Sequence, residues 1–164
     1  MEYNRTKAQV GVSLPMQQMK KSFSQELHNQ FDSYGKRAVK KYFMSRFGIY
    51  LLENEDRYAV DMIAYKDGTK LGYVEIEVRE SWSADSFPFD SLHIPERKGK
   101  LLCNDLKTVL VSVNKIGSRA FICKADIILN SPMKERRNKY VESGEKFYLV
   151  DPSKIRLVNL KEEQ

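Results

Sequence analysis

The chain has 164 residues, of which 41% are hydrophobic and 30% are charged. These are the values of an ordinary globular protein, so they exclude a largely disordered chain, and the length favours one domain with its own core. The formal net charge of +6 indicates only a mild preference for polyanionic partners, because 22 acidic residues accompany the 28 basic ones.

The remaining bulk features exclude several classes of protein. Cys103 and Cys123 lack the spacing of a zinc site, so we interpret them as reduced, structural cysteines. The sequence contains neither a signal peptide nor a run of 18 apolar residues. We therefore expect a cytoplasmic protein that has no membrane partner.

The N-terminal third of the sequence predicts helices. Residues 1–14 are polar and aperiodic, so we expect a flexible arm there, and residues 15–164 form the α/β domain. From Pro15 apolar residues recur every three or four positions, which predicts a helix that Gly35 interrupts. The helical period resumes over residues 36–47 and ends before Gly48.

After Gly48 the pattern is that of strands. Three β-rich runs with short turns between them, residues 49–53, 57–65 and 70–78, predict an antiparallel meander. A long loop over residues 79–93 then leads to a helix in which Pro95 takes the first position. Further strands are expected at residues 107–113, 119–129, 146–150 and 154–160, while residues 133–144 fit neither pattern clearly.

Acidic side chains interrupt two of the apolar strands. Because side chains alternate along a strand, Glu75 and Glu77 point to one side, while Val74 and Ile76 point to the core. Asp61 interrupts the preceding strand and is expected roughly 5 Å away, beside Glu75. Three converging carboxylates suit Mg²⁺ or Mn²⁺, which phosphodiester hydrolysis uses to polarise water.

Two alternatives account for the same glutamates without any chemistry. Glu75 and Glu77 can be ordinary solvent-facing residues of an edge strand. A salt bridge from Arg79 or Lys70 would also explain their presence.

The predicted elements follow one another in a particular order, with Asp61 on the second strand and Glu75-x-Glu77 on the third. In this arrangement the chain resembles the PD-(D/E)XK nuclease superfamily over about residues 35–128. The resemblance implies a restriction-endonuclease-like fold, which is a single α/β domain with a mixed central β-sheet flanked by helices (an αβββαβ core). It also implies that Asp61 and Glu75 are ligands of Mg²⁺ or Mn²⁺.

The lysine of the family motif is missing, because Glu77 occupies its place. In some restriction endonucleases a glutamate there is thought to serve as general base or as a further metal ligand. Elsewhere in the superfamily the lysine has moved to the following helix, where this chain has Lys98, with Arg97 and Lys100 as alternatives. The resemblance therefore gives a catalytic set of Asp61, Glu75, Glu77 and Lys98, in which the three acids bind the metal.

The loop that follows the acidic strand carries aromatic residues. Trp82, Phe87 and Phe89 can stack on bases or wedge a duplex, or they can simply anchor the loop. His93 has the two corresponding interpretations, as a proton donor or as a packing residue. The nucleic-acid contacts expected across the chain are Arg79, Trp82, Arg97, Lys100, Lys36 and Lys40, although the helical lysines also fit a solvated helix face.

The leading interpretation is a divalent-metal-dependent nuclease that acts on DNA rather than RNA. One alternative is a catalytically inactive nuclease-like module that binds nucleic acid or a protein partner. Another is a regulatory protein whose acidic strand is a solvated edge. The sequence leaves a homodimer open.

Overall fold

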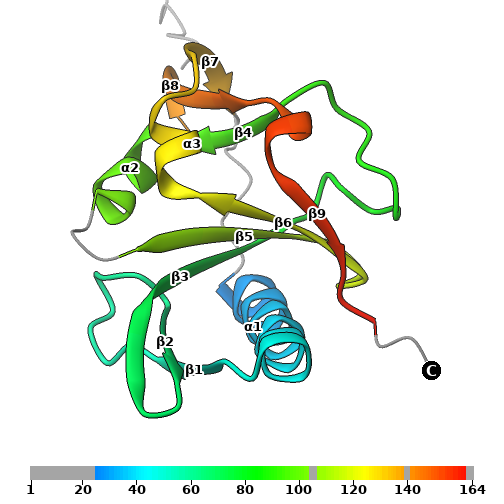
Figure 1. The fold of residues 1–164 in the computed structure, drawn as a ribbon. Coiled ribbons are helices and arrows are strands. Elements are labelled where there is room, and N and C mark those ends of the chain that lie inside the picture. Colours follow the sequence, from blue (N-terminus) through cyan, green and yellow to red (C-terminus); the bar gives the residue numbers. More distant parts are fainter. Residues whose placement is uncertain (1–24, 104–106, 139–140, 162–164) are drawn as a thin grey trace, which may run out of the picture.

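The computed structural model describes residues 25–103, 107–138 and 141–161 (Figure 1). The expected arm over residues 1–14, and the helical stretch as far as residue 24, lie outside these ranges. The elements are α1 (Gln25–Phe47), β1 (Tyr50–Glu53), β2 (Met62–Lys66), β3 (Thr69–Arg79), β4 (Leu92–Pro95), α2 (Glu96–Leu102), β5 (Thr108–Asn114), β6 (Arg119–Lys124), α3 (Ala125–Leu129), β7 (Met133–Asn138), β8 (Val141–Val150), the 3₁₀ turn η1 (Pro152–Lys154) and β9 (Arg156–Asn159). None of the described helices has the length and hydropathy needed to span a membrane.

Helix α1 is continuous, so the prediction that Gly35 breaks it is wrong. A Cβ at position 35 would overlap with the Val78 side chain, which shows that the glycine allows α1 to pack closely on β3. The buried side chains of Val39 and Phe43 continue this contact along the helix. The glycine therefore serves the packing of the helix rather than its termination.

The main sheet has six strands in the order β1-β2-β3-β5-β6-β9. Strands β1, β2 and β3 form the expected antiparallel meander, and β5 lies parallel to β3 after the chain has crossed over through α2. The sheet is therefore mixed. The α/β fold class and the αβββαβ order are confirmed.

The two faces of the sheet are covered differently, as Figure 1 shows. Helix α1 covers one face, where Val74 and Ile76 of β3 join its core cluster. On the other face lie α2, α3 and a second sheet of three strands in the order β4-β8-β7. A second core cluster fills this layer, and its members include Trp82, Leu110 and Phe121.

Several sequence predictions fail in this second layer. Residues 125–129 form helix α3 instead of extending β6, because a short apolar run does not by itself distinguish a buried helix from a strand. The supposed loop over residues 79–93 ends inside β4, and Pro95 is the last residue of that strand instead of the first of the helix. The described residues of the ambiguous stretch 133–144 lie in β7 and in the first part of β8. The strand predicted over residues 57–65 begins only at Met62, which leaves Asp61 just before it.

Candidate active site

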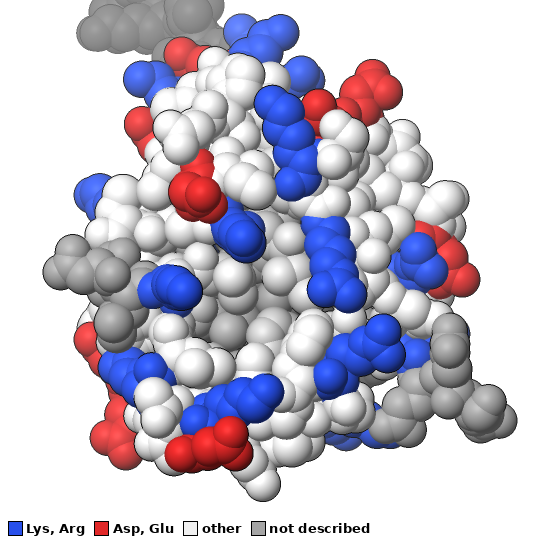
Figure 2. Space-filling view, in the orientation of Figure 1, with Lys and Arg blue, Asp and Glu red and all other residues white. Residues whose placement is uncertain are grey.

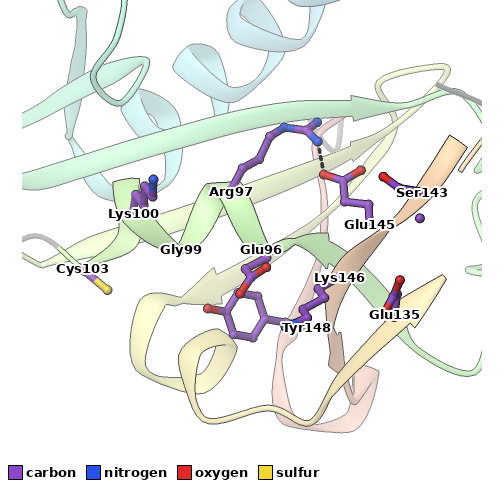
Figure 3. A pocket seen from close by; sticks show the side chains of 11 residues that line it. Glu96, Arg97, Gly99, Lys100, Cys103, Glu135, Ser143, Glu145, Lys146 and Tyr148 are labelled. Carbon is purple, nitrogen blue, oxygen red and sulfur yellow. Dashed lines mark hydrogen bonds and ion pairs between the residues drawn. The ribbon is translucent and has the colours of Figure 1, made fainter. Parts of the chain in front are cut away.

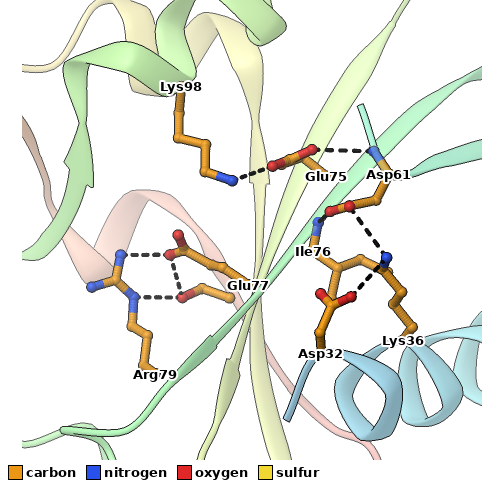
Figure 4. A network of polar contacts seen from close by, with 9 residues as sticks. Asp32, Lys36, Asp61, Glu75, Ile76, Glu77, Arg79 and Lys98 are labelled. Atoms are coloured by element: carbon orange, nitrogen blue, oxygen red, sulfur yellow. Dashed lines mark hydrogen bonds and ion pairs between the residues drawn. The ribbon is translucent and has the colours of Figure 1, made fainter. Parts of the chain in front are cut away.

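Asp61 and Glu75 meet where β2 begins beside β3 (Figure 4). The last residue pair between the two strands is Met62 with Val74, and from there to Arg79 β3 pairs with β5 alone among the described strands. Across this open edge, the main-chain N–H of Asp61 donates to Oε2 of Glu75 at 3.2 Å. In return, the N–H of Ile76 donates to Oδ2 of Asp61 at 2.9 Å. The expected neighbourhood of the two acids is therefore present.

A lysine from each neighbouring helix contacts one of these carboxylates. The Lys98 ammonium of α2 forms an ion pair with Oε1 of Glu75. The Lys36 ammonium of α1 lies 3.4 Å from Oδ1 of Asp61 and 2.9 Å from Asp32. The two carboxylates thus lie between cationic groups on both faces of the sheet.

Glu75 is only 4% exposed, and this burial raises the pKa of its carboxyl group. The positive charge of Lys98 opposes the rise, while the negative charge of Asp61 adds to it. At Lys36, burial lowers the pKa, but the hydrogen bond to Asp32 and the charge of Asp61 outweigh it and raise the pKa overall. Positive charge is therefore favoured beside this pair of acids.

Helix α2, which carries Lys98, packs closely on β8. A Cβ on Gly99 would lie 2.7 Å from the hydroxyl oxygen of Tyr148, so a larger residue there would require the tyrosine side chain to shift. Beside it, the Arg97 guanidinium forms an ion pair with Glu145 of β8, as Figure 3 shows. Arg97 and the exposed Lys100 line a pocket of about 1060 Å³ between α2 and the β7–β8 hairpin. Of the three basic residues considered on α2, Lys98 is the one that pairs with Glu75.

Glu77 does not join Asp61 and Glu75. Its Oε1 accepts hydrogen bonds from Arg79 at 2.5 Å and from the Ser112 hydroxyl at 3.0 Å. Arg79 also donates to Ser112 at 2.6 Å and to the main-chain oxygen of His93. The described residues contain no group of three or more His, Cys, Asp or Glu side chains that could hold a metal. The expected convergence of three carboxylates is thus replaced by a pair of acids, and the alternative of a salt bridge to Arg79 holds for Glu77.

Trp82 is completely buried, so the expectation that it stacks on a base is wrong. Its ring lies 5.3 Å from the rings of Phe87 and Phe121, and its Nε1 donates to the main-chain oxygen of Ser86. The tryptophan therefore anchors the loop, which was the alternative interpretation. Phe89 remains 47% exposed.

Lys40 and His93 also have partners within the protein. Lys40 pairs with Glu53 at 3.2 Å, and His93 lies 3.0 Å from the Ser91 hydroxyl. Sequence reasoning missed Asp32 and Ser112. Asp32 carried a weak signal, because it precedes Lys36 by one helical turn. Ser112 carried none, since it reaches Glu77 only through the pairing of β3 with β5.

Comparisons with known proteins give little further information. No model of a known protein family matches the sequence, and no curated protein sequence matches it. One similar solved structure is that of Hjc, a Holliday junction resolvase from the archaeal hyperthermophile Archaeoglobus fulgidus. It is 12% identical, with a TM-score of 0.42, and the match covers 73% of this chain and 85% of that chain. A similarity at this level carries no functional conclusion.

Proposed function

We propose that the protein is a divalent-metal-dependent nuclease that hydrolyses phosphodiester bonds, with DNA as its substrate, and that residues 15–164 form the nuclease domain. One observation carries the proposal. Asp61 and Glu75 lie together at the open edge of β3, and Lys98 contacts Glu75 from the following helix.

The two acids fit Mg²⁺ or Mn²⁺. Mg²⁺ in phosphoryl-transfer sites is usually held by one or two carboxylates and keeps several waters, so a third carboxylate is not required. Two carboxylates at a partly buried position also need positive charge nearby. Asp61 and Glu75 would hold the ion, which when bound would polarise the attacking water and offset charge on the phosphate oxygens.

The protein's own groups have separate tasks in this proposal. The N–H of Ile76 orients the Asp61 carboxylate, and the N–H of Asp61 orients that of Glu75. The Lys98 ammonium would hold the attacking water or a phosphate oxygen. We assign this role to Lys98 rather than Glu77, because Lys98 contacts Glu75, whereas Glu77 is bound to Arg79 and Ser112 instead.

A specific observation favours a second candidate function, an inactive module that binds nucleic acid. Lys98 and Lys36 place positive charge beside Glu75 and Asp61 without a metal. Such pairs can stabilise a site that no longer needs an ion. The inactive module predicts nucleic-acid binding that neither Mg²⁺ nor a chelator changes.

The test is a cleavage panel of supercoiled plasmid, linear duplex, single strands, branched DNA and RNA, each with Mg²⁺, Mn²⁺ or a chelator. We expect metal-dependent cleavage of at least one DNA substrate, which Asp61→Asn abolishes. Lys98→Met should lower the single-turnover rate about 10²–10⁴-fold, as for a lost proton-transfer or water-positioning group. Glu77→Gln, the matched control, should have a much smaller effect. A folded wild-type protein that cleaves nothing, or an Asp61→Asn variant with full activity, would exclude the proposal.

A further inference from the structure

A second positively charged site lies away from the candidate active site, in a groove between the C-terminal half of α1 and β9. The groove has a volume of about 500 Å³. Four basic residues line it, namely Lys41, Arg46, Arg156 and Lys161, and none of the described lining residues is acidic. Figure 2 shows Lys and Arg side chains spread over this face of the molecule, and some of them lie at the lower right, near α1 and β9 of Figure 1.

The groove has a defined structure beneath its exposed charges. The Arg156 guanidinium lies over the Phe47 ring, with its carbon 6.0 Å from the ring centroid. The Phe47 ring packs edge-to-face against the rings of both Tyr42 and Phe43, with 5.8 Å between the ring centroids in each pair. An arginine that stacks on a fixed ring keeps its N–H groups directed outward, which suits planar recognition of an anion.

Three of the four basic residues of the groove have no ion-pair partner within the described part of the chain. No ion pair there involves Arg46, Arg156 or Lys161, and all three side chains are exposed. This contrasts with Lys36, Lys40, Arg79, Arg97 and Lys98, all of which pair with carboxylates. The groove is therefore better suited to an external anion than those basic residues are.

We propose that the α1–β9 groove binds backbone phosphates of the nucleic acid, as a contact separate from the candidate active site. Guanidinium groups match phosphate oxygens in a two-pronged geometry. Arg46 follows Lys36 of the candidate site by ten residues, which is about 15 Å along a helix. At about 3.4 Å per nucleotide, that corresponds to four or five nucleotides of duplex.

The inference rests on the proposed function in one respect, namely that the polyanion bound in the groove is nucleic acid. The test therefore measures binding in chelator, where no cleavage is needed. The probe is a short fluorescent DNA duplex, and its anisotropy is followed over a series of salt concentrations. The variants are Arg46→Glu, Arg156→Glu, their combination, and Arg46→Lys with Arg156→Lys. The matched control is Arg137→Glu on β7, which changes the net charge equally at an exposed arginine of the second sheet.

We expect each single charge reversal, Arg46→Glu or Arg156→Glu, to weaken DNA binding. Each should also reduce the magnitude of the slope of the logarithm of the association constant against the logarithm of the salt concentration by about one, and the double reversal should reduce it by about two. The double lysine variant keeps the charge, so it should keep most of the slope. Circular dichroism checks that Arg156→Glu, which loses its contact with Phe47, retains the fold. If that variant unfolds, Arg46→Glu alone decides the result.

Three outcomes would overturn the inference: unchanged binding in Arg46→Glu and the double reversal, an equal loss in Arg137→Glu, or no binding of duplex by the wild-type protein. These are distinguishable from failure of the proposed function. A protein that binds through the groove but cleaves nothing overturns only the nuclease proposal. A protein that cleaves DNA but binds it equally well without the groove arginines overturns only this inference.

Discussion

The ion pair between Lys98 and Glu75 gives the sharpest test of how the candidate site is stabilised. The Glu75 side chain is 5% exposed and that of Lys98 is 21% exposed. Lys98→Met keeps the aliphatic chain and removes the charge, which leaves a buried carboxylate beside Asp61. Removal of one partner from a buried pair costs about 3–5 kcal/mol. Because Lys98 is partly exposed and Glu75 can take up a proton, we expect the lower end of that range.

The expected loss is large enough to measure in two ways. A loss of about 3 kcal/mol in the free energy of unfolding lowers the Tm of a chain of this size by about 6–12 °C. Urea denaturation gives the free energy directly, provided that unfolding is two-state. Glu75→Gln in the Lys98→Met background should restore most of the stability, because no unpaired charge remains. Lys40→Met is the matched control, since its partner Glu53 is 67% exposed and such pairs are worth less than about 1 kcal/mol.

Metal binding should offset the loss of stability in Lys98→Met. At a Mg²⁺ concentration of 100 times the Kd, mass action adds about 2.7 kcal/mol of stability, which nearly replaces the missing lysine charge. The rise should disappear when Asp61→Asn and Glu75→Gln are added. The reasoning is refuted if Lys98→Met is no less stable than Lys40→Met, or if Mg²⁺ stabilises the variant without the two acids equally.

Three further predictions concern the surrounding structure. Trp82→Ala should lower the free energy of unfolding by about 3–5 kcal/mol and leave DNA affinity unchanged under folded conditions; lost affinity in a folded variant would restore the stacking role. Burial, with the charges of Arg136 and Arg79, lowers the pKa of His93, so the folded state binds fewer protons. The free energy of unfolding should therefore fall as the pH drops below about 6.5, and it should fall less in His93→Gln. Urea midpoints that change with pH by the same amount in the wild-type protein and in His93→Gln would contradict this. Burial raises the pKa of Cys123 to about 12, so a thiol reagent should modify Cys103 alone in the folded protein and both cysteines in denaturant; rapid native labelling of Cys123 would refute its burial.

Local sequence pattern was enough to predict the centre of the fold. The alternation along residues 70–78 identified the buried face of β3. The short turn before it placed Asp61 of the preceding run beside Glu75, because strands joined by a hairpin are neighbours. Lys98 was assigned from the resemblance, which implies a lysine in the helix after the third strand, and the structure brings Lys98 into contact with Glu75.

Features set by long-range pairing could not be predicted in this way. Glu77 is held partly by Ser112, which follows it by 35 residues and reaches it only through the parallel pairing of β3 with β5. Strand β4 pairs with β8 across an even longer stretch of chain, so the sequence near it gave no sign of a partner strand. It was therefore divided between the predicted loop and the predicted helix. The burial of Trp82 likewise depends on Phe121, which β6 brings to it.

The central claim is that Asp61 and Glu75 together bind the divalent ion of a nuclease, and calorimetric titration with Mn²⁺ tests it most directly. The wild-type protein should bind Mn²⁺, and the variant that combines Asp61→Asn with Glu75→Gln should lose that binding while it keeps its fold. Glu77→Gln, as the matched control, should bind Mn²⁺ with nearly wild-type affinity. Equal Mn²⁺ affinity in the wild-type protein and in the doubly substituted variant would contradict the account.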